Sequence, residues 1–188
     1  MGSGEGLLIT PVLGKTISTR LPPPHIVWDF VRSLETSQMV SLDAHPWIQA
    51  LRLSYGDWVD PWIARLSKRQ WPIVYQHGDL APWNLIYASR KALVAVDWEH
   101  GAIEGFPYID IIHYYLQVSL LIYRLSAQKA KQLVMRFLSH QLSSFAPYEI
   151  EALVNLGVFS TFKQAEQDGH LESSYYQTWR RAIWMDKN

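Results

Sequence analysis

The chain has 188 residues and a balanced charge, with 17 lysines and arginines against 17 aspartates and glutamates. A neutral chain has no overall field to hold a phosphate backbone or an anionic membrane surface, so the composition argues against nucleic acid and membrane partners. The chain contains no cysteine, which excludes disulfides, thiolate metal sites and a thiol nucleophile and fits a cytoplasmic location.

The beginning of the chain predicts a leader, a linker and then one domain. Residues 1–6 lack the basic and apolar blocks of a secretory signal, and we expect a flexible leader there. Residues 7–20 open with LLITPVL, which predicts a short strand running into a hinge-like linker. Residues 21–188 have the size of one ordinary domain, so we expect them to share a single core.

Helical periodicity dominates the next stretch and then gives way to strands. Apolar residues in 25–35 recur at the spacing of an amphipathic helix. A second helical region is predicted over 46–70, interrupted near Gly56 and restarted near Pro61. From 71 to 99 the pattern predicts a strand, a polar loop, a strand, a turn and a further strand, ALVAVDWE.

After a connecting stretch, GAIEGFP, the chain is predicted to be helical to its end. The expected helices cover residues 108–125, 127–143, 148–162 with Gly157 as a weak point, and 175–184. The first of them is apolar almost all round, which is typical of a buried central helix. Its interruptions by Asp110, His113 and Gln117 disfavour a membrane span. The fold class expected is α+β, mostly α-helical, with one small β-hairpin region.

The polar loop in YQHGDLAPWNLIY contains the first candidate site residues, Asp79 and Asn84. They are five residues apart in the sequence, so their Cα atoms are separated by at most about 17 Å, and a curled loop can turn both side chains to one cleft. The run ALVAVDWE then brings Asp97 and Glu99. Because side chains alternate along a strand, these two acids are expected on one face.

This set of carboxylate and amide oxygens predicts a magnesium site that works on phosphate. Mg²⁺ prefers oxygen ligands and usually takes one or two carboxylates together with substrate phosphates. Phosphoryl transfer also needs a positioned base near the attacking hydroxyl. Asp79 can be that base and Asn84 with Asp97 the metal ligands, while Glu99 is either a further metal contact or a solvated strand end.

A family resemblance points the same way. The motif residues are His77-Gly78-Asp79, Asn84 and Asp97-Trp98-Glu99. They resemble the kinase catalytic loop H-R-D-x-x-x-x-N and its metal-binding D-F-G. With Gly78 in place of the arginine and DWE in place of DFG, the pattern is similar to the aminoglycoside phosphotransferase and choline kinase family. The resemblance, which includes GFPYIDIIHYYL, covers roughly residues 7–125.

The resemblance implies a protein-kinase-like C-terminal lobe that transfers a phosphoryl group from ATP, with Mg²⁺, to a hydroxyl of a small molecule of the aminoglycoside, choline or sugar type. His77, on the predicted strand before the glycine, and Asp110, at the start of the predicted helix, are expected to support the loop structurally. Only thirteen residues precede Gly14, so the nucleotide-covering N-terminal lobe is expected to be largely absent, and the residues that bind the nucleotide are not identified.

Other interpretations stay open. Asp79, Asn84 and Asp97 are also the residue types that cap ordinary turns. The chain could be a truncated or degenerate kinase-like module that binds a ligand or partner without catalysis. A metal-dependent hydrolase, with water in place of the acceptor, is a third interpretation. Apolar surface left by a missing lobe would favour self-association.

Overall fold

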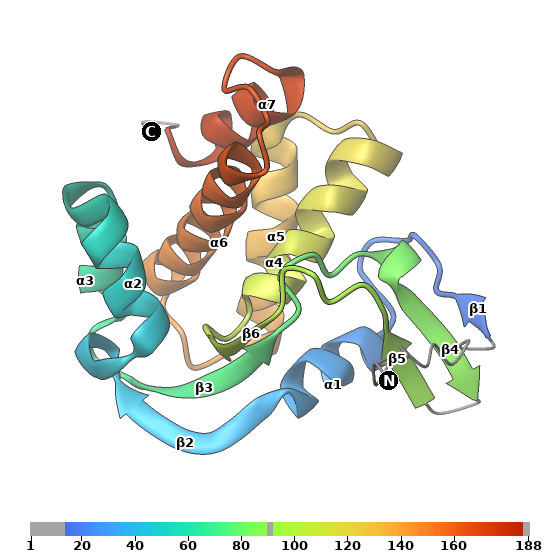
Figure 1. Cartoon of the computed structure of the whole chain (residues 1–188), viewed down its shortest axis with the longest axis horizontal. Helices are drawn as coiled ribbons and strands as arrows, with labels where there is room; N and C mark the ends of the chain where they lie inside the picture. The colour runs from blue at the N-terminus through green and yellow to red at the C-terminus, as the bar shows by residue number, and fades with distance from the viewer. Residues whose placement is uncertain (1–13, 90–91, 186–188) are drawn as a thin grey trace, which may run out of the picture.

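The computed structural model describes residues 14–89 and 92–185 (Figure 1). The leader and the strand predicted at LLITPVL lie outside the described residues. The helices are α1 (His25–Ser33), α2 (Pro46–Tyr55), α3 (Asp60–Leu66), α4 (Ile109–Gln117), α5 (Ala127–Gln141), α6 (Pro147–Gln167) and α7 (Tyr175–Trp184). A π-helical turn, η4 (Val118–Ile122), extends α4, and short 3-10 turns occur at η1 (Leu42–Ala44), η2 (Gly56–Trp58) and η3 (Pro82–Asn84).

The strands form two small antiparallel sheets within the described residues. One has the order β1-β4-β5 and the other the order β2-β3-β6. Their bounds are β1 (Lys15–Thr16), β2 (Glu35–Ser41), β3 (Gln70–Gln76), β4 (Leu85–Ser89), β5 (Ala92–Ala95) and β6 (Ala102–Gly105). The prediction of a mostly helical α+β fold is confirmed, since 56% of the structure is helical.

The expectation of a single β-hairpin region is wrong, because β2 and β6 were not predicted. The β2 sequence, ETSQMVS, is mostly polar, and its side chains are half-buried or exposed. β6 has only four residues and lies in the stretch interpreted as a connection. Both strands lie at the edges of their sheet and pair with the central strand β3, so backbone pairing rather than an apolar pattern specifies them.

Two helices form the centre of the core. Every residue of α4 from Ile109 to Leu116 is buried, as the apolar sequence predicts. α6 is longer than predicted and runs without a break through Gly157. A Cβ atom at Gly157 would lie 2.9 Å from a methyl carbon of Ile112 in α4. The glycine therefore serves close packing of α4 on α6 and is not a weak point of the helix.

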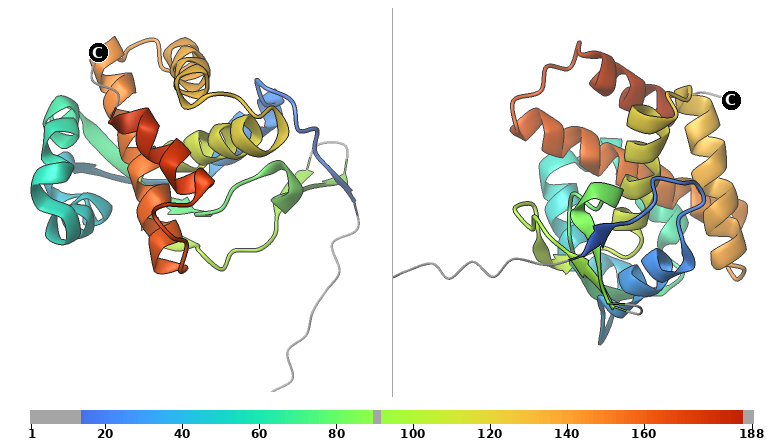
Figure 2. Two further views of the ribbon diagram at one scale, coloured as in Figure 1. Left: turned by 90° about the horizontal axis from the view of Figure 1, so that it is seen from above. Right: turned by 90° about the vertical axis from the view of Figure 1, so that its right-hand side faces the viewer.

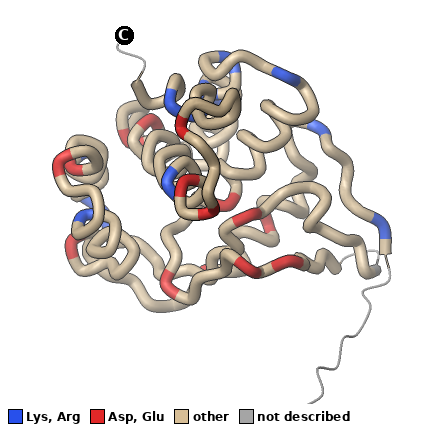
Figure 3. Tube along the Cα trace, turned by 45° about the horizontal axis from the view of Figure 1, so that its top comes forward, with Lys and Arg blue, Asp and Glu red and all other residues tan. Residues whose placement is uncertain are grey.

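The views agree on the placement of the peripheral elements (Figures 1 and 2). α2 and α3 lie at one end of the molecule and the sheet β1-β4-β5 at the other, with α4 and α6 between them. Basic and acidic residues are spread over many elements (Figure 3). Within 14–89 and 92–185, no helix combines the length and hydropathy that a membrane crossing requires.

Candidate active site

The loop between β3 and β4 begins with a sharp backbone turn. Gly78 has φ +83°, a conformation that L side chains rarely adopt. A Cβ atom there would also collide with the backbone of His100. Glycine is therefore required by backbone conformation and by the close approach of the segment that precedes β6. The turn directs the next residue, Asp79, away from β3.

The side chain of Asp110, in the first turn of α4, binds the backbone of this loop. Its carboxylate accepts hydrogen bonds from the backbone N–H of His77, at 2.8 Å, and of Gly78, at 2.9 Å. The side chain is buried, and burial raises the pKa of Asp110, while the two N–H donors act in the opposite direction. The sequence analysis assigned Asp110 to loop support, and these two bonds are the contacts it makes with the loop.

The His77 side chain connects the loop to the segment after β5. Its Nε2 donates to the carbonyl oxygen of Val96 at 2.8 Å, which leaves Nδ1 to accept from the backbone N–H of Asp79 at 3.3 Å. The ring is fully buried and packs against Trp98, with 4.7 Å between ring centroids. The loop is thus fixed from two sides, by α4 and by the chain beyond β5.

Asp79 contacts two polar side chains. Its Oδ1 lies 2.9 Å from Nε2 of His113 in α4, and its Oδ2 accepts from the amide nitrogen of Asn84 at 3.2 Å. The same Asn84 nitrogen donates to the backbone carbonyl of Asp79 at 2.9 Å. Burial alone would raise the pKa of Asp79, but the bonds from His113 and Asn84 outweigh it and hold the pKa below its usual value. Asp79 is therefore an ionised carboxylate at neutral pH.

The structure brings the backbone of Asp97 close to that of Asn84, although not through the strand that was expected. β5 ends at Ala95, so the strand-alternation argument for Asp97 and Glu99 is wrong. Instead, the backbone N–H of Val96 donates to the carbonyl oxygen of Asn84 at 2.9 Å, which brings the next residue alongside. Asp97 has φ +65° and an exposed side chain. Glu99 is 69% exposed and faces Nε2 of His100, at 3.4 Å.

The donor set is small for a metal site. In the part of the chain that the structure describes, no group of three or more histidine, aspartate or glutamate side chains could hold a metal ion. Asn84 uses its amide nitrogen on Asp79, which leaves the amide oxygen available, and the Asp97 carboxylate makes no described hydrogen bond or ion pair. Two oxygen ligands fit a Mg²⁺ ion that arrives with substrate phosphates rather than one held by a protein cage.

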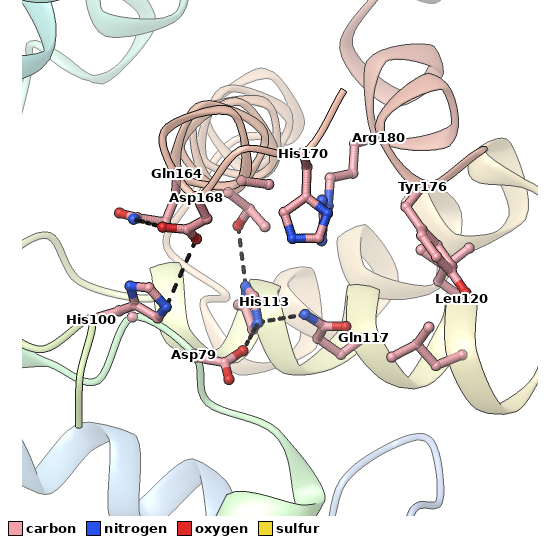
Figure 4. Close-up of a pocket in the computed structure, with 14 residues that line it drawn as sticks. Asp79, His100, His113, Gln117, Leu120, Gln164, Asp168, His170, Tyr176 and Arg180 are labelled. Atoms are coloured by element: carbon pink, nitrogen blue, oxygen red, sulfur yellow. Dashed lines mark hydrogen bonds and ion pairs between the residues drawn. The ribbon is translucent and has the colours of Figure 1, made fainter. Parts of the chain in front are cut away.

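Asp79 also lines a cavity of about 340 Å³ between the loop and the helices α4, α6 and α7 (Figure 4). Its polar lining includes His100, His113, Gln117, Thr161, Gln164, Asp168, His170, Tyr176 and Arg180. Sequence reasoning missed this lining. A usable signal existed only in α4, where residues 110, 113 and 117 share the spacing of one helix face. The contributions of α6 and α7 had no signal in the sequence.

A scan against protein-family models finds none that matches this chain, and searches of curated proteins and of solved structures find no match. The kinase-like lobe stays a prediction, and the case for a function depends on the geometry of the site.

Proposed function

We propose that this chain is a phosphotransferase of kinase-like type, which transfers a phosphoryl group from ATP to a hydroxyl of a small molecule. Asp79 acts as the base, and Asn84 and Asp97 are the Mg²⁺ ligands. The observation that supports this most directly is the position of Asp79, an ionised carboxylate held by His113 and Asn84 in the wall of a cavity of small-molecule size.

Asp79 would orient the acceptor hydroxyl and receive its proton. In a loose transition state the hydroxyl keeps its proton until late, so a carboxylate with a lowered pKa suits this role. The acceptor oxygen forms a bond to the γ-phosphorus of ATP, the bond from phosphorus to ADP breaks, and the hydroxyl proton passes to Asp79. Charge and atoms balance without any further reactant.

Asn84 and Asp97 supply the oxygen atoms for the metal. A bound Mg²⁺ ion would neutralise charge on the phosphate oxygens. The bond from Val96 to Asn84 keeps the two ligands on neighbouring backbone positions, and the amide of Asn84 is oriented by Asp79. The Asn84 side chain therefore links the proposed base, Asp79, to the proposed metal site.

The support of the loop is consistent with catalysis, because phosphoryl transfer depends mainly on positioning. Asp110 accepts from the backbone N–H of His77 and of Gly78, and the His77 side chain bonds to the backbone of both Val96 and Asp79. These contacts are buried or half-buried and leave the loop little freedom to move relative to α4.

Phosphorus NMR of the full chain with ATP, Mg²⁺ and a panel of small hydroxyl compounds tests the proposal. Formation of a phosphomonoester together with ADP is the expected result. Asp79→Asn should lower the rate by about 10²- to 10⁴-fold, while the control Asp57→Asn, at an exposed position in η2, should leave it unchanged. Full transfer by Asp79→Asn contradicts the assignment of the base.

A second candidate is a binding module without catalysis. The orientation of Asp97 favours it, because the carboxylate is exposed and makes no described contact with Asn84 or Asp79. The phosphorus NMR assay with ATP and Mg²⁺ separates the two candidates. Formation of a phosphomonoester eliminates the second, and phosphate release that needs no acceptor supports a hydrolase instead.

A further inference from the structure

One wall of the cavity beside Asp79 includes a positively charged side chain, Arg180, that lacks a carboxylate partner. Arg180, in α7, lines the cavity together with Asp79, and Figure 4 shows its side chain entering from α7 with His113 and Gln117 lying toward Asp79. The guanidinium is partly buried, and burial lowers the pKa of Arg180 while the charge of Asp79 acts in the opposite direction. A charge withdrawn from water needs compensation from a partner.

Arg180 differs from the other described arginines in its lack of that partner. Those with a carboxylate within 4.0 Å are Arg32, Arg52, Arg65, Arg69 and Arg181. The exposed arginines that lack such a partner are Arg20, Arg124 and Arg136. Arg180 is the one arginine in 14–89 and 92–185 that is both partly buried and without an ion pair.

The acids near Arg180 have other partners. Asp79 bonds to His113 and Asn84. Asp168, which also lines the cavity, accepts from Gln164 at 3.1 Å and lies 3.8 Å from His100. Neither carboxylate forms an ion pair with Arg180, so the positive charge faces the cavity.

The guanidinium is held in place by a buried amide. Its Nη1 donates to Oε1 of Gln177 at 2.8 Å, and Nε2 of Gln177 donates to the backbone carbonyl of Phe162 at 2.9 Å. Gln177 is fully buried. One edge of the guanidinium is thereby fixed, and its remaining N–H groups make no hydrogen bond within the described chain. A fixed fork of this kind suits bidentate binding of a carboxylate or a phosphate.

We propose that the acceptor taken by this site is a small hydroxylated anion, with its hydroxyl at Asp79 and its carboxylate or phosphate group at Arg180. The inference rests on the proposed function and narrows its substrate class. A volume of about 340 Å³ is at the small end of ligand cavities, which fits a compact acceptor better than a large polycationic one. Positive charge on the ligand would be repelled by Arg180.

A series of three-carbon compounds that share a vicinal diol and differ at the third carbon tests the charge preference. Glycerate and glycerol 3-phosphate are anionic, glycerol is neutral, and 3-amino-1,2-propanediol is cationic. Binding of each to the full chain can be measured by ligand-observed NMR titration. We expect at least one anionic diol to bind about tenfold or more tightly than glycerol, and the amine to bind most weakly. Equal binding of glycerol and both anions overturns the inference.

Matched variants in α7 identify the residue responsible. Arg180→Gln should remove the preference for the anion, and Arg180→Lys, which keeps the charge without the fork, should retain part of it. Arg181→Gln is the control, because that residue pairs with Glu172 and does not line this cavity. Circular dichroism establishes that each variant is folded. Wild-type anion binding by a folded Arg180→Gln contradicts the assignment.

The outcomes separate this inference from the proposed function. Anion binding that depends on Arg180, without any transfer from ATP, supports the anion site and contradicts the proposed function. Transfer from ATP to the aminodiol in preference to the anions supports the proposed function and overturns the anion site. Whichever of glycerate and glycerol 3-phosphate binds more tightly identifies the recognised group as carboxylate or phosphate.

Discussion

The carboxylate of Asp79 and the imidazole of His113 face each other, with 2.9 Å between Oδ1 and Nε2. An ionised Asp79 can only accept, so Nε2 of His113 donates the hydrogen between them. On the other side of the ring, Nδ1 of His113 lies 3.2 Å from the hydroxyl of Thr161, which donates to the carbonyl of Gly157. The imidazole is therefore positioned between the loop and α6.

Removing the imidazole should change the acidity of Asp79. In His113→Gln the pKa of Asp79 should rise toward its ordinary value of about 3.9, because the bond that opposes the effect of burial is weakened. Carbon-13 NMR titration of the Asp79 carboxyl measures the shift without any assay of activity. His140→Gln, at an exposed position in α5, is the control. An unchanged Asp79 pKa in His113→Gln contradicts the role given to the imidazole.

Two substitutions of Asp97 should differ in their effect on stability but not in their effect on MgATP binding. Its φ of +65° favours glycine, so Asp97→Ala should be less stable than Asp97→Gly by about 1 kcal/mol. Both variants lack the carboxylate and should bind MgATP more weakly than the wild type. Urea denaturation and calorimetric titration measure the two quantities. Undiminished MgATP binding by the glycine variant would remove Asp97 from the proposed metal site.

Because the Asp110 carboxylate accepts two backbone hydrogen bonds, replacing it should lower the free energy of unfolding. Asp110→Asn replaces one acceptor oxygen with a donor, which leaves a backbone N–H of His77 or Gly78 without a partner in a buried position. The unfolding free energy should fall by about 1–3 kcal/mol. Asp57→Asn, in an exposed turn, provides the comparison and should change stability by less than about 0.5 kcal/mol. Equal stability of the two variants would show that the carboxylate is not needed to hold the loop.

His45, which precedes α2, predicts a dependence of stability on pH. The side chain is fully buried, and burial lowers its pKa although the carbonyl of Pro72 and the charge of Glu104 act the other way. Above pH of about 6.5 the imidazole is neutral in both states. Below that value the unfolded chain takes up the proton more readily, so the unfolding free energy falls as the pH decreases.

Urea denaturation between pH 7.5 and 5 measures this effect. His45→Gln should show a smaller loss of stability over the interval than the wild type, since the titrating group is gone. His140→Gln, whose side chain is exposed, should keep the wild-type dependence. Parallel curves for His45→Gln and the wild type would exclude His45 as the source.

The sequence allowed the helices to be predicted well and the sheets less well. α4 and α6 follow from long apolar runs, whereas β2 is polar and β6 is short, and both depend on pairing with β3. Within the candidate site, the contact of Asp79 with Asn84 joins residues of one loop, and their spacing made it predictable. Arg180 is different, because its orientation comes from Gln177 and the carbonyl of Phe162, which only tertiary packing brings together.

The close contact at Gly157 lies between the two helices whose residues His113 and Thr161 line the cavity beside Asp79. Ile112 of α4 reaches the backbone of α6 there because no side chain intervenes, and His113 and Thr161 follow on the two helices. A methyl group at this position would push the helices apart and lengthen the bond between imidazole and hydroxyl. The absence of a side chain at Gly157 should therefore influence the size of ligand that the cavity accepts, although Gly157 itself does not line the cavity.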